Sequence, residues 1–277
     1  MISGKTTLIA HIGFPTESFK APMIYNPWFD SKGIDACVVP MGVRPEDFVS
    51  SMAAIMRLSN LRGALITMPH KVSTVALMDE VTPAVQIAGA CNAVLRREDG
   101  SLLGDQFDGE GFVRGVLRKG RQLDGASVLV SGAGGVGSAI AASLAAAGVG
   151  ELALFDARPD SAEALAQRLR THYPKLRVRT GSNDPQGFDV IVNATPLGMK
   201  EDDPLPFDVS RIPSTAFVGE VVMKSEFTPL LRAARDKGCG FQVGTDMLFE
   251  MIPAYLEFFG FGSATAEELR ATATIAY

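Results

Sequence analysis

A glycine-rich segment, Gly132-Ala133-Gly134-Gly135-Val136-Gly137, is the part of this sequence whose chemistry is easiest to interpret. A Val/Leu-rich run that predicts a strand at 127–131 precedes it, and an Ala-rich run that predicts a helix at 137–147 follows. In that context GxGxxG is typical of dinucleotide binding, because the glycines permit a tight turn, close approach of the pyrophosphate and close helix packing. The free N–H groups at the helix N-terminus favour phosphate. We therefore predict that residues 132–137 bind a dinucleotide.

The next predicted strand, 152–156, ends in an acidic residue, Asp156. A carboxylate at about this distance after the glycines accepts hydrogen bonds from the adenosine ribose and repels a 2′-phosphate. Asp156, with the adjacent Ala157, therefore favours NAD, and NADP is the less expected cofactor. Arg158 leaves some NADP use open, because its guanidinium could bind a phosphate. A purely local role for Asp156 in a turn or helix cap is the alternative.

Two further charges, Lys71 and Asp108, follow other predicted strands. Lys71 comes just after a predicted strand at 63–68, and Asp108 lies in a glycine-flanked segment, 104–111. Considered alone, a charged residue in either position is more often an ordinary loop residue than a catalytic one.

Together with other segments, they resemble the shikimate/quinate dehydrogenase family over nearly the whole chain. The family's Gly-x-Asn-Val-Thr-x-Pro-x-Lys is similar to 63–71, and its Asn-x-Thr-Pro-x-Gly-Met loop is similar to 193–199. The other similar segments, in the expected order, are 89–94, 104–111, 228–231 and 244–248.

This resemblance implies reversible hydride transfer between NAD(P) and a ring secondary alcohol or ketone, with Lys71 and Asp108 as the catalytic pair. As hydride leaves carbon, the hydroxyl proton must pass to a base. Burial favours proton loss from a lysine and a nearby carboxylate opposes it, so the sequence leaves the division of roles open. The resemblance also implies substrate hydrogen bonds from Thr67 and Asn92, and cofactor contacts from Asn193, Thr195, Pro196, Gly244 and Met247.

The substrate pocket departs from the family pattern. The two serines that hold the shikimate carboxylate in the family fall here on Phe19 and Ala21, with Ser18 one position away as a partial substitute. Losing two hydrogen bonds to a charged group would weaken recognition by ~3–6 kcal/mol. Other polar family positions are apolar here, namely Leu65, Phe107, Met223 and Met251. We therefore expect a cyclic hydroxy acid or polyol that differs from shikimate, unless these apolar residues are core packing and the alignment is shifted.

Two alternatives stay open. One is a genuine shikimate or quinate dehydrogenase with a rearranged carboxylate site. The other, from a different class, is a non-catalytic NAD-binding sensor, which the lost pocket residues favour but the presence of Lys71 and Asp108 opposes.

The alternation of predicted strands and helices indicates an α/β protein of two domains. We expect a substrate-binding and catalytic domain of residues 1–107 plus 244–277, with a mixed or parallel sheet completed by C-terminal helices. A hairpin is expected around the Asp-Gly turn at 99–100. Residues 108–243 should form a Rossmann-type, doubly wound parallel sheet.

Composition excludes several functions. A net charge of −5, from 26 basic and 31 acidic residues, with no Lys/Arg run, argues against nucleic acid and anionic membranes as partners. The charge-free stretch 126–150 is rich in glycine and serine, so we do not read it as a membrane span. Three widely spaced cysteines indicate free thiols and a cytoplasmic location. Three histidines without ligand spacing argue against a metal site, and homodimer formation is left open.

Overall fold

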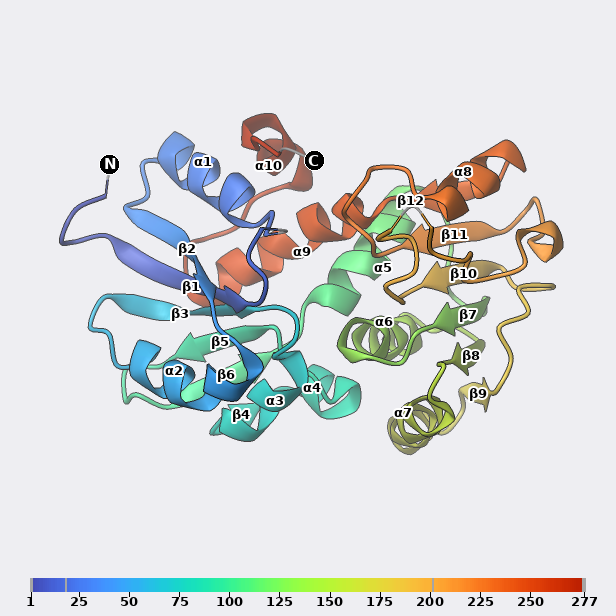
Figure 1. Ribbon diagram of the computed structural model, residues 1–277, viewed down its shortest axis with the longest axis horizontal. Coiled ribbons are helices and arrows are strands. Elements are labelled where there is room, and N and C mark those ends of the chain that lie inside the picture. The colour runs from blue at the N-terminus through green and yellow to red at the C-terminus, as the bar shows by residue number, and fades with distance from the viewer. Residues whose placement is uncertain (1, 18, 201, 276–277) are drawn as a thin grey trace. The chain divides into compact units, whose positions relative to one another are not determined.

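The computed structural model describes residues 2–17, 19–200 and 202–275 (Figure 1). The chain divides into two compact units. The first runs to Phe107 and resumes at Met251, and the second is Asp108–Glu250. Each unit contains its own six-stranded sheet, so each is described separately.

The sheet of the first unit is mixed, in the order β2-β1-β3-β5-β6-β4. Strand β1 is parallel to β2 and β3, whereas β5 is antiparallel to β3 and β6. The β5–β6 pair is the hairpin that the Asp-Gly turn predicts. The strands are β1 (Thr7–Gly13), β2 (Ala36–Gly42), β3 (Leu61–Ile66), β4 (Glu80–Val81), β5 (Ala93–Arg96) and β6 (Leu102–Asp105).

Helices cover this sheet. Helix α1 packs against β2 and against α10, as Figure 1 shows. Phe48 and Met52 of α2 join Ala10, Ile12 and Ala64 in one buried core. The elements are α1 (Pro22–Lys32), α2 (Phe48–Ile55), α3 (Lys71–Thr74), α4 (Pro83–Ala88) and α10 (Ala266–Thr272), with short 3₁₀ helices at Pro45–Asp47 and Val75–Leu77.

The sheet of the second unit is entirely parallel, in the order β12-β11-β10-β7-β8-β9. Counted from β7, this is the doubly wound order 3-2-1-4-5-6. Because crossovers are right-handed, reversal of the strand order between β7 and β10 puts helices on both faces of the sheet. The strands are β7 (Ser127–Ser131), β8 (Glu151–Phe155), β9 (Arg177–Thr180), β10 (Val190–Asn193), β11 (Phe217–Glu220) and β12 (Gly240–Gln242).

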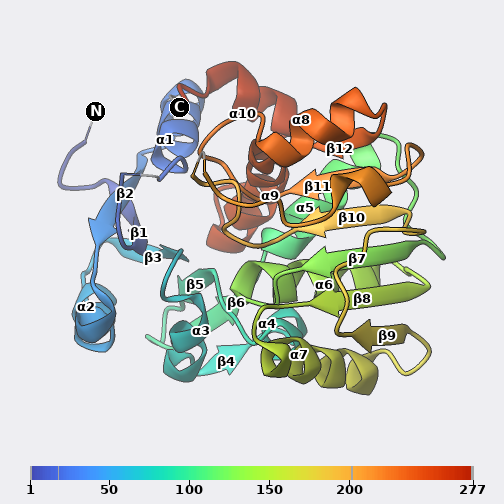
Figure 2. The same ribbon diagram turned by 45° about the vertical axis from the view of Figure 1, so that its right-hand side comes forward.

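The helices of the second unit pack on the sheet through their apolar faces. Leu230, Leu231 and Ala234 of α8 pack with Leu129 and Ile191 of the sheet. Helices α5 and α6 lie side by side (Figure 2). No helix in the described part of the chain is long and apolar enough to span a membrane. The elements are α5 (Asp108–Arg118), α6 (Gly135–Ala146), α7 (Pro159–His172) and α8 (Pro229–Asp236), with a 3₁₀ helix at Val209–Arg211.

Helix α9 (Gly244–Phe259) contains the second division between the units. The sequence places that boundary at 243/244, but the units divide between Glu250 and Met251. Ion pairs explain the difference, because Lys119 Nζ lies 3.0 Å from Asp246 Oδ2 and Arg118 pairs with Glu250. The first turns of α9 are therefore tied to the end of α5.

Candidate functional site

The glycine turn of the second unit joins β7 to α6, next to the point where the strand order reverses between β7 and β10. Gly132 has φ +103°, and its N–H donates to the Phe155 carbonyl at 2.7 Å. A Cβ on Gly132 would lie 2.6 Å from the Ala194 carbonyl oxygen, and one on Gly137 would lie 1.8 Å from the Gly132 oxygen. Only glycine fits at these two positions, because the turn, the helix and the loop after β10 are in backbone contact.

The N-terminus of α6 fits a dinucleotide pyrophosphate. Helix α6 begins at Gly135, two residues before the predicted start, and its N-cap Gly134 offers no side chain to the free N–H groups. A Cβ on Gly134 would meet nothing within 4 Å. The residues around the turn thus combine open space with unsatisfied donors and a helix dipole, which is what phosphate binding needs.

Asp156 directly follows β8 and is hydrogen-bonded to the glycine turn. Its Oδ2 accepts from Ala133 N at 2.7 Å and its Oδ1 accepts from Arg158 N at 2.8 Å. The Arg158 side chain is 78 % exposed, with Nε 3.8 Å from Asp156 Oδ1. Asp156 therefore has the local role in a turn that the sequence analysis gave as the alternative to ribose binding. Its remaining lone pairs are still compatible with ribose hydroxyls.

The loop after β10 is organised by Asn193, which is fully buried. Its amide Nδ2 donates to Leu197 O and Glu220 Oε1, both at 3.0 Å, while its Oδ1 accepts from Thr195 N and Oγ1. The Pro196 carbonyl accepts from Met199 N at 3.1 Å. The Asn193 side chain is thus used in shaping this loop.

Glu220 is a buried acid at the end of β11 to which the sequence assigned no role. It accepts hydrogen bonds from Asn193, Val221 N, Val222 N and the Thr228 hydroxyl. Burial raises the pKa of Glu220 to about 7, against the lowering effect of these donors. No local pattern reveals this role, because the donors come from separate segments.

Gly244 and Met247 lie at the start of α9 in the second unit. A Cβ on Gly244 would lie 2.3 Å from the Val222 carbonyl oxygen and 3.0 Å from Cγ of Met223. Met247 is buried and Met223 half-buried. Gly244 therefore lies against the chain that follows β11, next to Met223, and Met247 follows it in the first turn of α9.

In the first unit, Thr67, Lys71 and Asn92 meet at the carboxyl end of β3. Lys71 opens α3, and its carbonyl accepts from Cys91 N at 2.8 Å. Asn92 O accepts from Ile66 N at 2.8 Å, and Thr67 N donates to Ile12 O at 2.9 Å. Three residues predicted from two separate motifs, 63–71 and 89–94, are thus joined through hydrogen bonds of their backbone.

Asn92 is 1 % exposed, and its two amide atoms differ in their bonding. Oδ1 accepts from Phe107 N at 3.0 Å, whereas Nδ2 has no hydrogen-bond partner among the described residues. Asp108, the next residue after Phe107, is buried at the N-terminus of α5.

The predicted apolar pocket residues have different environments. Phe107 packs against Tyr255 and Phe258 with centroid distances of 4.8 and 5.5 Å, so it is a core residue and the packing alternative is correct there. Phe19 is half-buried, whereas Ala21 is buried as the N-cap of α1. Ser18 lies outside the described residues. Leu65 is buried in β3, and Met251 is half-buried in α9.

His11 in β1 lies beside these residues, and sequence reasoning missed it. Its ring stacks on Phe19 with centroids 4.1 Å apart. Burial and then the Lys71 charge lower the pKa of His11 to about 3. A histidine within an apolar strand gives no sequence signal beyond its type.

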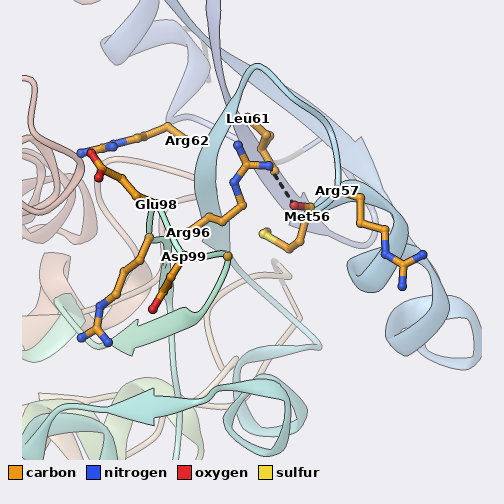
Figure 3. A pocket seen from close by; sticks show the side chains of 9 residues that line it. Met56, Arg57, Leu61, Arg62, Arg96, Glu98 and Asp99 are labelled. Carbon is orange, nitrogen blue, oxygen red and sulfur yellow. Dashed lines mark hydrogen bonds between the residues drawn. The ribbon is translucent and has the colours of Figure 1, made fainter.

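A separate pocket in the first unit lies at the other end of β3, near Leu61 and Arg62 (Figure 3). The Arg96 guanidinium there donates to the carbonyls of Met56 and Leu58 at 3.0 and 2.6 Å. This arginine therefore holds the end of α2. No group of three or more potential metal ligands occurs in the described ranges.

Models of known protein families match segments of both units. The model of the shikimate dehydrogenase substrate binding domain matches residues 12–94, and the ThiF family model matches 114–159. A curated shikimate dehydrogenase (NADP(+)) of Rubrobacter xylanophilus is 37 % identical over 251 residues, covering 89 % of this chain and 88 % of that protein.

Two solved structures are similar along their length. Shikimate 5-dehydrogenase of Listeria monocytogenes, in complex with shikimate and NAD, has a TM-score of 0.87 at 25 % identity, covering 98 % of this chain and 97 % of its own. Quinate dehydrogenase of Corynebacterium glutamicum, in complex with NAD, has a TM-score of 0.86 at 29 % identity, covering 96 % and 98 %.

The doubly wound unit with its glycine turn and the mixed-sheet unit with Lys71 define a two-domain, NAD(P)-dependent oxidoreductase acting on CH–OH groups. More specifically, the chain belongs to the shikimate dehydrogenase family.

Proposed function

We propose that this protein catalyses reversible hydride transfer between NAD(P) and a ring secondary alcohol or ketone, with a substrate that has diverged from shikimate. The observation that carries this proposal is the Asn92 amide, a buried donor that has no hydrogen-bond partner among the described residues and lies next to the backbone of the Lys71 segment. Leaving such a donor unsatisfied costs ~1–3 kcal/mol. A substrate hydroxyl or carbonyl oxygen would remove that cost.

The proposed chemistry divides between proton and hydride. The nicotinamide, when bound, accepts or returns the hydride. In the oxidation, the C–H bond breaks with its electron pair and the alcohol O–H proton passes to the Lys71/Asp108 pair. Asn92 and Thr67 orient the substrate oxygens.

The proposed divergence of the substrate rests on the family's two carboxylate-binding serines, replaced here by Phe19 and Ala21. An aromatic ring and a buried methyl group offer no hydrogen bond to a carboxylate. We expect a cyclic polyol or a hydroxy acid that presents its acid elsewhere. A genuine shikimate or quinate dehydrogenase with a rearranged carboxylate site is the second candidate, which the names of the relatives favour.

We propose NAD as the preferred cofactor, although several curated relatives are named for NADP(+). The Asp156 carboxylate beside the glycine turn supports this, because it would repel a 2′-phosphate.

We propose a reducing, cytoplasmic location for the protein, which its three free cysteines support.

The test is steady-state kinetics with NAD and NADP on shikimate, quinate and neutral cyclic polyols. We expect turnover with kcat/KM for shikimate below that of another panel member. Lys71→Ala should lower kcat by 10²-fold or more, on the order of a lost general base, while exposed Lys5→Ala serves as the matched control. Unchanged turnover in Lys71→Ala would refute the mechanism, and shikimate as the best substrate would establish the second candidate.

A further inference from the structure

His11 occupies a defined place at the substrate side of the first unit. It pairs in parallel register with Leu65 of β3, so the two side chains point to the same face of the sheet. The next residue of β1 on that face is Gly13. A Cβ there would lie 2.3 Å from Cγ2 of Thr67 and 2.9 Å from Cζ of Phe19. His11, Gly13, Phe19 and Thr67 therefore form one cluster.

The His11 imidazole is buried without full hydrogen bonding. The residue is 8 % exposed, and Nδ1 has no hydrogen-bond partner among the described residues. The protein's other buried histidine differs in this respect. His70 also stacks on a phenylalanine, Phe48, at 4.0 Å, but its Nε2 lies 2.7 Å from the Val43 carbonyl oxygen. Stacking alone thus does not account for a histidine at position 11.

The imidazole is also uncharged. Burial is the larger cause of its low pKa and the Lys71 charge the smaller. That effect of Lys71 means that its ammonium group lies near the ring. A nitrogen of a neutral imidazole can donate a hydrogen bond to an oxygen or accept one from a hydroxyl group. The ring supplies no positive charge for a carboxylate.

We propose that His11 is a specificity-determining residue that hydrogen-bonds, through Nδ1, an uncharged hydroxyl or carbonyl oxygen of the ring substrate, at the place where Phe19 has replaced a carboxylate-binding serine. This inference rests on the proposed function and narrows its substrate class to neutral ring polyols and their ketones. In this arrangement the Phe19 ring packs against the face of the substrate ring. Asn92 and Thr67 hydrogen-bond other oxygens of the same substrate.

The kinetic test uses His11→Leu, His11→Asn and His11→Gln on the best substrate of the panel above. His11→Leu should lower kcat/KM about 10- to 100-fold, mainly through KM, because a buried substrate oxygen loses its partner. His11→Asn places a polar atom at the Nδ1 position and should recover most of that loss, whereas His11→Gln, which reaches the Nε2 position, should not. Exposed His172→Asn is the matched control.

The second measurement does not depend on turnover or on the stability of a variant. With three histidines in the chain, ¹⁵N-labelled imidazoles can be assigned by NMR, and shikimate and myo-inositol serve as the probes. Myo-inositol should shift the His11 Nδ1 signal and leave His70 and His172 unchanged. An unshifted His11 signal in the presence of both probes, or a larger shift with shikimate, would overturn the inference.

The two proposals fail in different ways. If the wild type turns over no panel member, the proposed function fails, while the NMR experiment still decides for or against His11. If the wild type is active and His11→Leu has the same KM, the enzyme assignment stands and the role of His11 is wrong.

Discussion

The Asn193 amide and the Glu220 carboxylate hydrogen-bond at 3.0 Å between the ends of the adjacent strands β10 and β11. Both residues are completely buried. Glu220 also accepts from two backbone N–H groups and from Thr228. One carboxylate therefore joins the loop after β10, the chain after β11 and the N-cap of α8.

Replacing Glu220 should destabilise the second unit strongly. Glu220→Ala removes the acceptor of four hydrogen bonds, and we expect a loss of about 3 kcal/mol or more in the free energy of unfolding. Glu220→Gln keeps one carbonyl oxygen, and the Thr228 hydroxyl can turn to accept, so it should cost less than half as much. Urea denaturation of both variants, with exposed Glu226→Ala as the control, measures this. Equal stability of Glu220→Ala and Glu226→Ala would contradict it.

The same carboxylate should make stability depend on pH. Its pKa is about 7 in the folded protein against 4.5 for the free side chain, so the folded state binds the proton more tightly. The contribution to stability is full below pH 4.5 and is lost as the pH rises through about 7, by up to about 3 kcal/mol. In Glu220→Gln this dependence should vanish. The difference in unfolding free energy between wild type and Glu220→Gln, measured from pH 4.5 to 7.5, tests the sign, and an increase with pH would refute it.

Two glycines of the turn should respond differently to alanine. Gly137→Ala places a Cβ 1.8 Å from the Gly132 oxygen, so the helix must shift, and we expect a cost of ~1–3 kcal/mol, although alanine ordinarily stabilises helices. Gly134→Ala meets nothing within 4 Å and should fold normally. Because its methyl group enters the phosphate space, NAD affinity should fall about 10-fold. Thermal melts and NAD titrations separate these effects, and normal stability of Gly137→Ala would be inconsistent with the geometry.

Asp156→Ala should weaken discrimination between the two cofactors. Removing the carboxylate ends its repulsion of a 2′-phosphate and its bond to Ala133 N. We expect the ratio of kcat/KM for NAD to that for NADP to fall about 10-fold. Asp160→Ala, an exposed acid in the first turn of α7, is the control. A wild type that prefers NADP, or a ratio that Asp156→Ala leaves unchanged, would refute the proposed preference.

Much of the fold could be predicted because local periodicity and turn residues carry it. The strand at 127–131 has the predicted bounds, and the hairpin at 93–105 forms around its Asp-Gly turn. The short elements α3, α4, β4 and β12 were not predicted. Segments of two to six residues have little stability of their own and form through the contacts of the folded protein.

The sequence by itself determined the glycine turn, the acid after β8 and the order of motifs that identifies the family, since each depends on residues close together in the chain. Only the tertiary structure decided that Phe107 is core, that Glu220 joins three segments, and that His11 stacks on Phe19 while its Nδ1 has no partner in the described part of the chain. Burial and hydrogen bonding between distant segments arise when strands pair and helices pack, and no local pattern of residue types contains that information.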